Sequence, residues 1–346
     1  MTEGGTYVIL FSYTFLNLCC QKINLRYYHS FLRSMRDDFL YACTDGQRYR
    51  KRFFKSQLVT WKLCVLCFLL FISAIVLVGI GCTMLIVYLM NRVPDDPNDK
   101  GRPLLFPVWW FDTDVSATPY FEFFFTYTNY TILMIGYVYC YMTQTQLVWV
   151  RQITTKCDLI IYAIEDLMED IQPTSDPEEL ERYNGLIKKR FGTIIKQHHA
   201  MLRLLEDFAG VYKKLLMYEQ KLGGPVICFT VYAMTEKWAN DGQLHPVLII
   251  LSVSVFVVCI IPSYMCTILG EKIRSISDAC LYMPFWNASK VVRPYLVLLM
   301  QRSLRSLPLQ APGFEDVSLQ TFSSNMAAAY SMFNMLRQTN LGSTLN

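Results

Sequence analysis

The stretch that decides the fold is LCVLCFLLFISAIVLVGIGCTMLIVYLM, which runs from Leu63 to Met90 without a charged residue. About 20 apolar residues suffice for a helix to cross a bilayer, so this run is long enough to span. A second run, QLHPVLIILSVSVFVVCIIPSYMCTILG, extends from Gln243 to Gly270 and is equally free of charge. Two such runs predict a membrane protein.

The composition of the whole chain supports the same prediction. Of its 346 residues 53% are hydrophobic and only 17% are charged, and the mean hydropathy is +0.25. Soluble domains carry about 25% charged residues. Three weaker apolar stretches, Gly4–Cys20, Phe121–Val150 and Met217–Ala239, and the neutral stretch Ser318–Arg337 bring the visible transmembrane helices to six. We therefore predict an all-α, polytopic helical membrane protein.

The charges of the connecting segments predict the orientation, because cytoplasmic loops carry an excess of Lys and Arg. The segment from Lys22 to Lys55 is basic, whereas Asn91–Pro119 contains more Asp than basic residues. This alternation continues along the chain and places both chain ends outside. The predicted order is a transmembrane helix at 1–20, a cytoplasmic basic loop at 21–62, a transmembrane helix at 63–90, an extracellular loop at 91–119, a transmembrane helix at 120–150, a cytoplasmic helical region at 151–216, a transmembrane helix at 217–239, an extracellular loop at 240–245, a transmembrane helix at 246–270, a cytoplasmic helix and link at 271–313, and a transmembrane helix at 314–337.

Two inner segments have the pattern of amphipathic helices. Apolar residues recur at three and four positions in Ile187–Leu205 and in Val291–Leu307. This spacing places them on one helix face, and no lipid is available there to cover that face. We expect a cytoplasmic helical anchor bundle that contacts other subunits; the alternative is an ordinary solvated loop.

Motifs of catalysis are absent from the sequence. It contains no Walker loop, no GxGxxG, no HExxH and no GxSxG. Cys64 and Cys67 have the CxxC spacing, but they lie in an apolar span without a nearby His. The adjacent residues His198 and His199 point to different helix faces, so a shared metal is disfavoured. We expect no enzyme activity, no cofactor, no metal site and no nucleic-acid partner.

The closing segment Ala279–Arg337 resembles that of the insect odorant receptors. The positions that carry the resemblance are Trp286, Arg302, Pro308–Leu309, Gly313–Phe314, Ser318–Leu319, Thr321–Phe322 and Tyr330–Ser331. The external stretch LLFPVWWFD, Leu104–Asp112, is similar to a family motif, although Leu105 stands in place of a Pro. The inner stretch Ile195-Lys-Gln-His198 is also similar to a family helix. The family has seven spans with the N-terminus inside, so we expect Gly4–Cys20 to correspond to the second span and the first to be missing.

The resemblance implies a function. Members of the family are tetrameric cation channels in which the last helix of each subunit lines a central pore and the odorant subunit assembles with a shared co-receptor subunit. We accordingly expect a ligand-gated, non-selective cation channel subunit in the plasma membrane, on the dendrites of olfactory sensory neurons. A gustatory receptor channel subunit is the nearest alternative. A G-protein-coupled receptor is disfavoured, because it needs seven spans with the N-terminus outside.

Topology and depth select the candidate site residues. A small volatile ligand is expected in an apolar, aromatic pocket in the outer half of the spans, surrounded by membrane lipid. The candidate ligand-binding residues are Tyr7, Phe11, Gly81, Met84, Leu85, Tyr88, Phe124, Tyr127, Thr128, Tyr130, Tyr232 and Leu248. The candidate pore and gate residues are Met326, Ala329, Tyr330, Phe333, Leu336 and Arg337, with Phe333 and Leu336 as the hydrophobic gate and Arg337 at the outer mouth.

Overall fold

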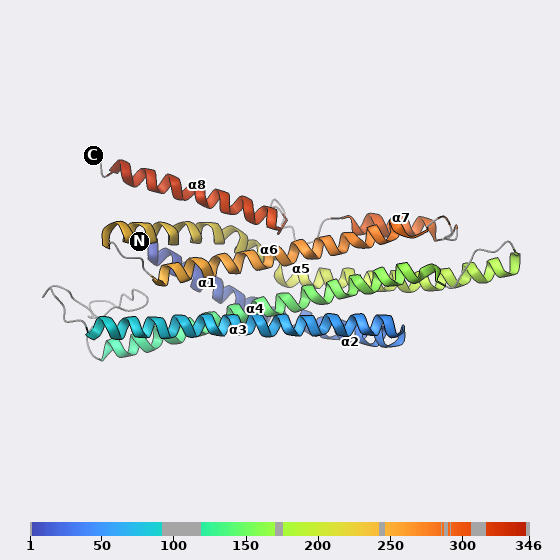
Figure 1. The fold of residues 1–346 in the computed structure, drawn as a ribbon, viewed down its shortest axis with the longest axis horizontal. Helices are drawn as coiled ribbons and strands as arrows, with labels where there is room; N and C mark the ends of the chain where they lie inside the picture. Colours follow the sequence, from blue (N-terminus) through green and yellow to red (C-terminus); the bar gives the residue numbers. More distant parts are fainter. Residues whose placement is uncertain are drawn as a thin grey trace.

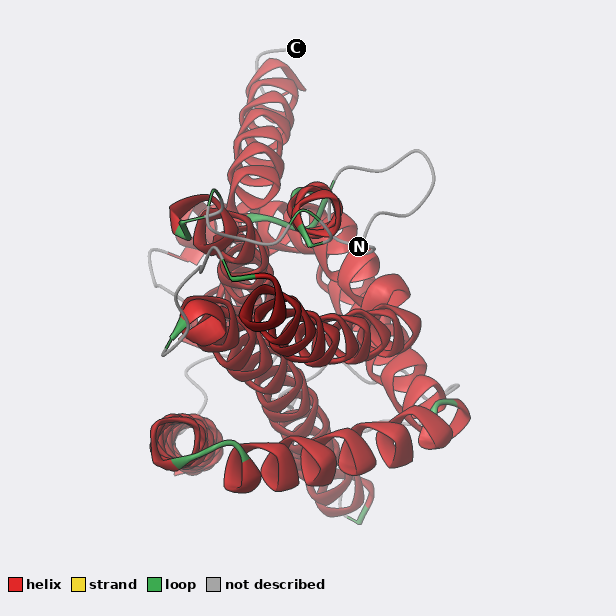
Figure 2. Ribbon diagram, turned by 90° about the vertical axis from the view of Figure 1, so that its right-hand side faces the viewer, coloured by secondary structure: helices red, strands yellow, loops and turns green. Residues whose placement is uncertain are grey.

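The computed structural model describes residues 2–91, 119–169, 176–241, 246–284, 286, 290, 292–305 and 316–343. Every regular element within these ranges is a helix (Figure 1 and Figure 2). The elements are α1 (Thr2–Ile23), α2 (Leu25–Thr44), α3 (Gln47–Asn91), α4 (Tyr120–Glu165), the short 3₁₀ helix η1 (Asp166–Met168), α5 (Pro177–Asp241), α6 (Pro246–Tyr282), α7 (Arg293–Ser303) and α8 (Leu319–Ser343). The predicted extracellular loop 91–119 and the link before α8 fall almost entirely outside the described residues.

The basic segment at 21–62, which we expected to be a loop, is helical. It forms the end of α1, the whole of α2 and the start of α3. Neither Gly nor Pro interrupts α2 from Leu25 to Thr44, so nothing in its sequence breaks the helix. The reversal between α2 and α3 occurs at Gly46, whose φ of 121° is a conformation that side-chain-bearing residues rarely adopt.

The longest helices join predicted membrane and cytoplasmic segments without interruption. α5 has 65 residues, so at a rise of about 1.5 Å per residue it is about 100 Å long. It takes in both the polar region that begins at Pro177 and the apolar run that ends near Asp241. α4 and α6 likewise continue beyond their apolar runs, and Figure 1 shows these helices side by side along the long axis of the molecule.

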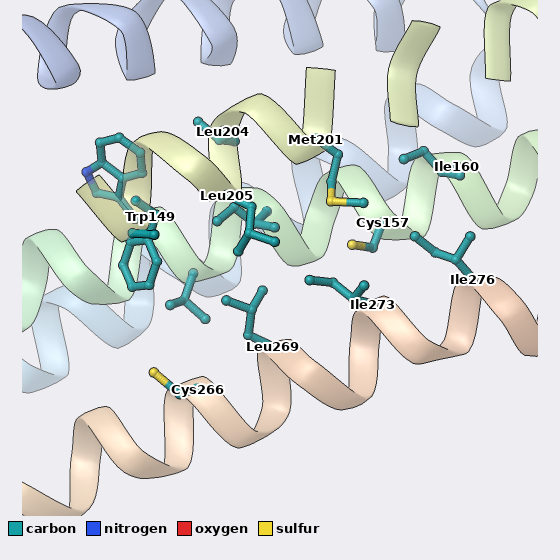
Figure 3. Close-up of a cluster of buried hydrophobic side chains, with 14 of the residues drawn as sticks. Trp149, Cys157, Ile160, Met201, Leu204, Leu205, Cys266, Leu269, Ile273 and Ile276 are labelled. Carbon is teal, nitrogen blue, oxygen red and sulfur yellow. The ribbon is translucent and has the colours of Figure 1, made fainter. Parts of the chain in front are cut away.

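The main hydrophobic core lies where α4, α5 and α6 meet. Figure 3 shows Trp149 and Ile160 of α4, Met201 and Leu205 of α5, and Leu269 of α6 pointing toward one another. Each of these side chains is almost entirely buried, and Trp149 also stacks on Phe31 of α2 with a centroid distance of 4.3 Å. This core holds the inner parts of the long helices in a fixed relation to each other.

The apolar stripe at Ile187–Leu205 belongs to the same core. Ile187, Phe191 and Ile194 are buried within the chain itself, so this stripe is not free to bind another subunit, contrary to our expectation. α7 differs, because Leu296 and Leu299 pack inward while Val297 and Leu298 are exposed. Of the two predicted contact helices, α7 alone retains an apolar face outside the core in the described part of the chain.

Two described segments are long and apolar enough to cross a membrane, Gln47–Ser73 and Ser252–Tyr282. The first is covered by few other side chains, and Phe68, Leu69 and Leu70 are about half exposed. Soluble monomers rarely expose contiguous apolar surface of this kind. The exposed band on α3 is suited to contact with lipid.

Candidate ligand pocket and pore helix

The first turns of α4 divide the predicted pocket residues between two faces. Phe124 and Thr128 are one helical turn apart and point inward, with 7% and 2% of their surfaces exposed. Tyr127 and Tyr130 lie on the other side and are 57% and 60% exposed. The hydroxyl of Thr128 donates to the carbonyl of Phe125 in its own helix. The structure therefore brings Phe124 and Thr128 into the interior and leaves the two tyrosines outside it.

The remaining pocket predictions are only partly described. Phe11 of α1 is 40% exposed, and Tyr232 of α5 is half-buried. The other predicted residues belong to α1, α3 and α6, but their side chains lie outside the described residues. These are Tyr7, Gly81, Met84, Leu85, Tyr88 and Leu248.

A polar cluster that sequence reasoning missed lies farther along the same helices. The hydroxyl of Tyr13 on α1 donates to Oε1 of Glu219 on α5, and its ring lies 5.5 Å from that of Tyr139 on α4. Asn17 is 1% exposed, and its amide makes no hydrogen bond within the described part of the chain; the same holds for Oε2 of Glu219. Glu219 could have been noticed in the sequence as a charged residue at the start of the apolar run Met217–Ala239, but no local pattern identifies Tyr13 as its partner.

The inner end of α8 is fastened to α5 and α6. Asn325 Nδ2 lies 3.2 Å from the carbonyl oxygen of Gln220 and 3.3 Å from its side-chain Oε1, and donates to both. The backbone N–H of Leu319 donates to Thr267 Oγ1 of α6 at 3.0 Å. Phe322 packs edge-on against Phe256 of α6, with 5.4 Å between ring centroids. These contacts fix one face of α8 against its own chain.

The opposite face of α8 is exposed. Most of its residues as far as position 331 are small or neutral and polar: Gln320, Ser323, Ser324, Ala327, Ala328 and Ser331. The large exposed side chains of the helix are Tyr330 and, farther along, Met335. Among the predicted pore residues, Tyr330 and Arg337 are exposed, whereas Ala329 is buried at 8% exposure. Met326, Phe333 and Leu336 are half-buried at the boundary between the two faces. Among the predicted pore residues, the structure thus separates the buried Ala329 from the exposed Tyr330 and Arg337.

The inner bundle is joined by buried ion pairs. Lys156 Nζ of α4 lies 2.6 Å from Asp38 Oδ1 of α2, and both side chains are at most 3% exposed. Gln152 also donates to Asp38, at 2.7 Å. Burial raises the pKa of Asp38 in spite of the lowering effect of Lys156. Nearby, Asp158 pairs with both Arg52 of α3 and Lys272 of α6, at 2.8 Å and 2.5 Å.

Of the adjacent residues His198 and His199, only His198 is buried. His198 is 4% exposed, and its Nε2 has no hydrogen-bond partner in the described structure. Burial lowers its pKa to about 4, assisted by His199 and Arg302. His198 is therefore neutral at physiological pH. No group of three His, Cys, Asp or Glu side chains suited to a metal is present among the described residues.

Comparison with known families identifies the chain. The family model of the 7tm odorant receptors matches residues 4–330. The chain belongs to the insect odorant receptor family. The resemblance inferred from Ala279–Arg337 is thereby confirmed.

Individual insect receptors are similar to this odorant receptor chain. Odorant receptor 67c of Drosophila melanogaster is 26% identical over 191 residues, which cover 55% of this chain and 44% of the relative. Odorant receptor 85f of the same organism is 24% identical over 193 residues, which cover 55% of this chain and 47% of the relative. The matching segment is thus less than half the length of these curated relatives.

Solved structures show the same fold. The insect olfactory receptor OR5 from Machilis hrabei superposes with a TM-score of 0.71 at 15% identity, covering 96% of this chain and 80% of OR5. Its complex with eugenol gives a TM-score of 0.72 at 15% identity, covering 98% of this chain and 81% of OR5. The all-α helical membrane fold predicted from the sequence is confirmed.

Proposed function

We propose that this odorant receptor chain is a subunit of an odorant-gated, non-selective cation channel. The observation that carries the proposal is the two-sided character of α8. One face is held against α5 and α6 through Asn325 and Phe322. The other face is exposed and, from Gln320 to Ser331, consists of small or neutral polar residues apart from Tyr330. A helix beside an ion pathway needs such a face, because neutral polar groups tolerate water and ions and small residues allow close packing between neighbouring helices.

The pathway is completed by other subunits. One copy of α8 exposes its polar face and encloses nothing, so a conduit requires several copies around an axis. We propose a tetramer formed with a co-receptor subunit, in the plasma membrane of olfactory dendrites. The exposed Val297 and Leu298 of α7 offer a cytoplasmic contact surface for that assembly.

The proposed odorant pocket uses the inward face at the start of α4. Phe124 and Thr128 form part of its lining, and Phe121, which is 4% exposed, extends the same surface. An apolar lining selects by shape at about 1–3 kcal/mol per methylene and favours uncharged esters, alcohols, aldehydes or terpenes. The candidates Tyr7, Gly81, Met84, Leu85, Tyr88, Tyr232 and Leu248 remain proposed members of the pocket.

The proposed gate lies in the outer part of α8. Phe333 and Leu336 are half-buried beside the exposed face, so a small rotation of the helix moves them toward or away from the conduit. Apolar side chains at a constriction stop ions by excluding water. Arg337 is exposed one residue farther on and places a fixed positive charge at the outer mouth.

The test is a patch-clamp recording from cells that express the chain with a co-receptor while G-protein signalling is blocked. A channel passes an odorant-evoked cation current under this block, whereas a G-protein-coupled receptor loses its response. A gustatory receptor would respond to non-volatile tastants in place of volatile odorants; the match to the odorant receptor model favours the odorant branch.

A further inference from the structure

The side-chain amide of Gln220 joins three helices at one point. It lies on α5, donates through Nε2 to Ser263 Oγ of α6, and accepts through Oε1 from Asn325 Nδ2 of α8 at 3.3 Å. The Nε2 group also lies 3.5 Å from the carbonyl oxygen of Cys259 on α6. Gln220 is 6% exposed, so these bonds are formed away from water.

The backbone around this point is built for close approach. Gly223 and Gly224 lie three and four residues after Gln220, about one helical turn away, and each faces a different helix. A Cβ atom at Gly223 would overlap Cys259 Sγ of α6. A Cβ atom at Gly224 would lie 3.4 Å from the carbonyl oxygen of Asn325 and 3.6 Å from Ala329 Cβ, both on α8. The two glycines allow α6 and α8 to approach α5 closely enough for the Gln220 bonds to form.

Both α5 and α6 also have a weakened backbone at this level. Pro225 of α5 has no N–H to donate to the carbonyl of Lys221, and Pro262 of α6 has none for Val258. A Pro inside a helix is the usual cause of a kink. Gln220 and Ser263 therefore link the two helices where each of them bends most easily.

Several contacts fasten α8 to α5 and α6 near its inner end. Asn325 bonds to Gln220, and Leu319, Phe322 and Ala329 make the neighbouring contacts. Figure 1 shows α8 running from this inner end toward the end of the molecule where the N-terminus lies. A shift of α5 or α6 at this level therefore reaches α8 through these contacts.

We propose that Gln220 is a positioning residue for gating: its amide transmits bending of α5 and α6 to the inner end of α8. The proposal rests on the proposed channel function. A leucine or methionine would fill a similar volume, but neither could accept from α8 and donate to α6 as the amide does. Polar side chains bonded across helices in a membrane stabilise a specific relation between those helices.

The test is a double-mutant cycle on the Gln220–Asn325 bond. The variants Gln220→Met, Asn325→Ala and the double variant are expressed with a co-receptor. The readout is the ratio of the resting current to the maximal current evoked by a direct co-receptor agonist, which does not depend on the number of channels at the surface. Asn129→Ala is the matched control, because the Asn129 amide donates to Phe125 one turn earlier in its own helix.

We expect each single variant to shift the ratio about threefold to tenfold in the same direction, as loss of one interhelical hydrogen bond predicts. The double variant should shift the ratio by less than the product of the two single shifts, because both changes remove the Gln220–Asn325 side-chain bond, while each also removes one further bond, that of Gln220 to Ser263 or that of Asn325 to the Gln220 carbonyl. Asn129→Ala should stay within about twofold of the wild type. If Gln220→Met does not reach the cell surface, the Asn325→Ala variant alone tests the proposal. This variant is expected to fold, because Ala is the best helix former and already occupies the nearby positions 327–329.

Two results would overturn the role of Gln220 while leaving the channel function intact: single variants that match the wild type, or single effects that multiply in the double variant. Absence of any wild-type current with either an odorant panel or the co-receptor agonist would instead remove the proposed channel function, and the gating role with it.

Discussion

Lys156 Nζ lies 2.6 Å from Asp38 Oδ1, and the two side chains are 3% and 2% exposed. This pair connects α4 with α2, the helix formed by the segment whose basic charge suggested a cytoplasmic loop. A buried charge without a partner is far more unfavourable than a buried pair. The pair therefore makes α2 an integral part of the inner bundle.

Replacement of one member should destabilise the protein strongly. Asp38→Ala leaves the Lys156 ammonium buried without its partner, and we expect a loss of about 3–5 kcal/mol in the free energy of unfolding. The double variant Asp38→Leu, Lys156→Met removes both charges and should be less destabilised than Asp38→Ala alone. Thermal melting of detergent-solubilised protein measures the difference; equal melting of wild type and Asp38→Ala would contradict the burial of the pair.

Stability should fall as the pH is lowered through the range set by His198. Its pKa is lowered from 6.5 to about 4 in the folded chain, with burial as the main cause. Between these values the unfolded chain binds more protons than the folded one, so the free energy of unfolding increases with pH there. Above pH 6.5 His198 is neutral in both states and makes no further difference.

The comparison that isolates this effect is His198→Gln. The variant should lose less stability than the wild type between pH 7 and pH 5, measured by melting at each pH. Parallel pH dependence in the two proteins would show that His198 is not the group responsible.

The helix faces of α4 predict which pocket substitutions alter odorant potency. Phe124→Ala and Thr128→Val change the buried face and should shift the odorant dose–response curve by roughly tenfold, the effect of about 1.4 kcal/mol of pocket contact. Tyr127→Ala and Tyr130→Ala change the exposed face and should produce smaller shifts. A direct co-receptor agonist serves as the control, because its potency should be the same in all four variants. Larger shifts for the two tyrosines than for Phe124 and Thr128 would place the ligand elsewhere.

The gate assignment predicts a change in resting conductance. Phe333→Ala shortens an apolar side chain at the proposed constriction, so water should enter more readily and the resting leak should increase. The measurement is whole-cell current without agonist, normalised to surface expression, with Leu69→Ala as the control, because Leu69 lies on the exposed band of α3 that is suited to lipid and away from the proposed conduit. Unchanged leak and rectification in Phe333→Ala would exclude Phe333 from the gate.

The helical membrane fold could be predicted from the sequence, because an uncharged run as long as Leu63–Met90 is stable in few environments other than a lipid bilayer. The sequence predicted less well what each helix face contacts. Depth along the span selected Phe124, Tyr127, Thr128 and Tyr130 alike, whereas the structure turns only Phe124 and Thr128 inward. Depth follows from position in the run, but the buried face depends on the neighbouring helices.

Long-range polar contacts could not be predicted from local spacing. Tyr13 and Glu219 are 206 positions apart, and Gln220 and Asn325 are 105 apart. Asn325 lies in the neutral stretch Ser318–Arg337, and no periodic pattern in that stretch identifies its partner on α5. For the stripe at Ile187–Leu205 the amphipathic pattern was evident from the sequence, but the pattern could not show that the stripe packs against helices of its own chain.

The central claim, that this odorant receptor chain is part of a cation channel, is tested most directly by recording in excised membrane patches. Patches from cells expressing the chain with a co-receptor are exposed to a panel of uncharged volatile esters, alcohols, aldehydes and terpenes, without nucleotides on the cytoplasmic side. We predict an odorant-evoked cation current that is absent when either subunit is expressed alone. An odorant response in intact cells that disappears in excised patches, or a full odorant-gated current from this chain alone, would contradict the account.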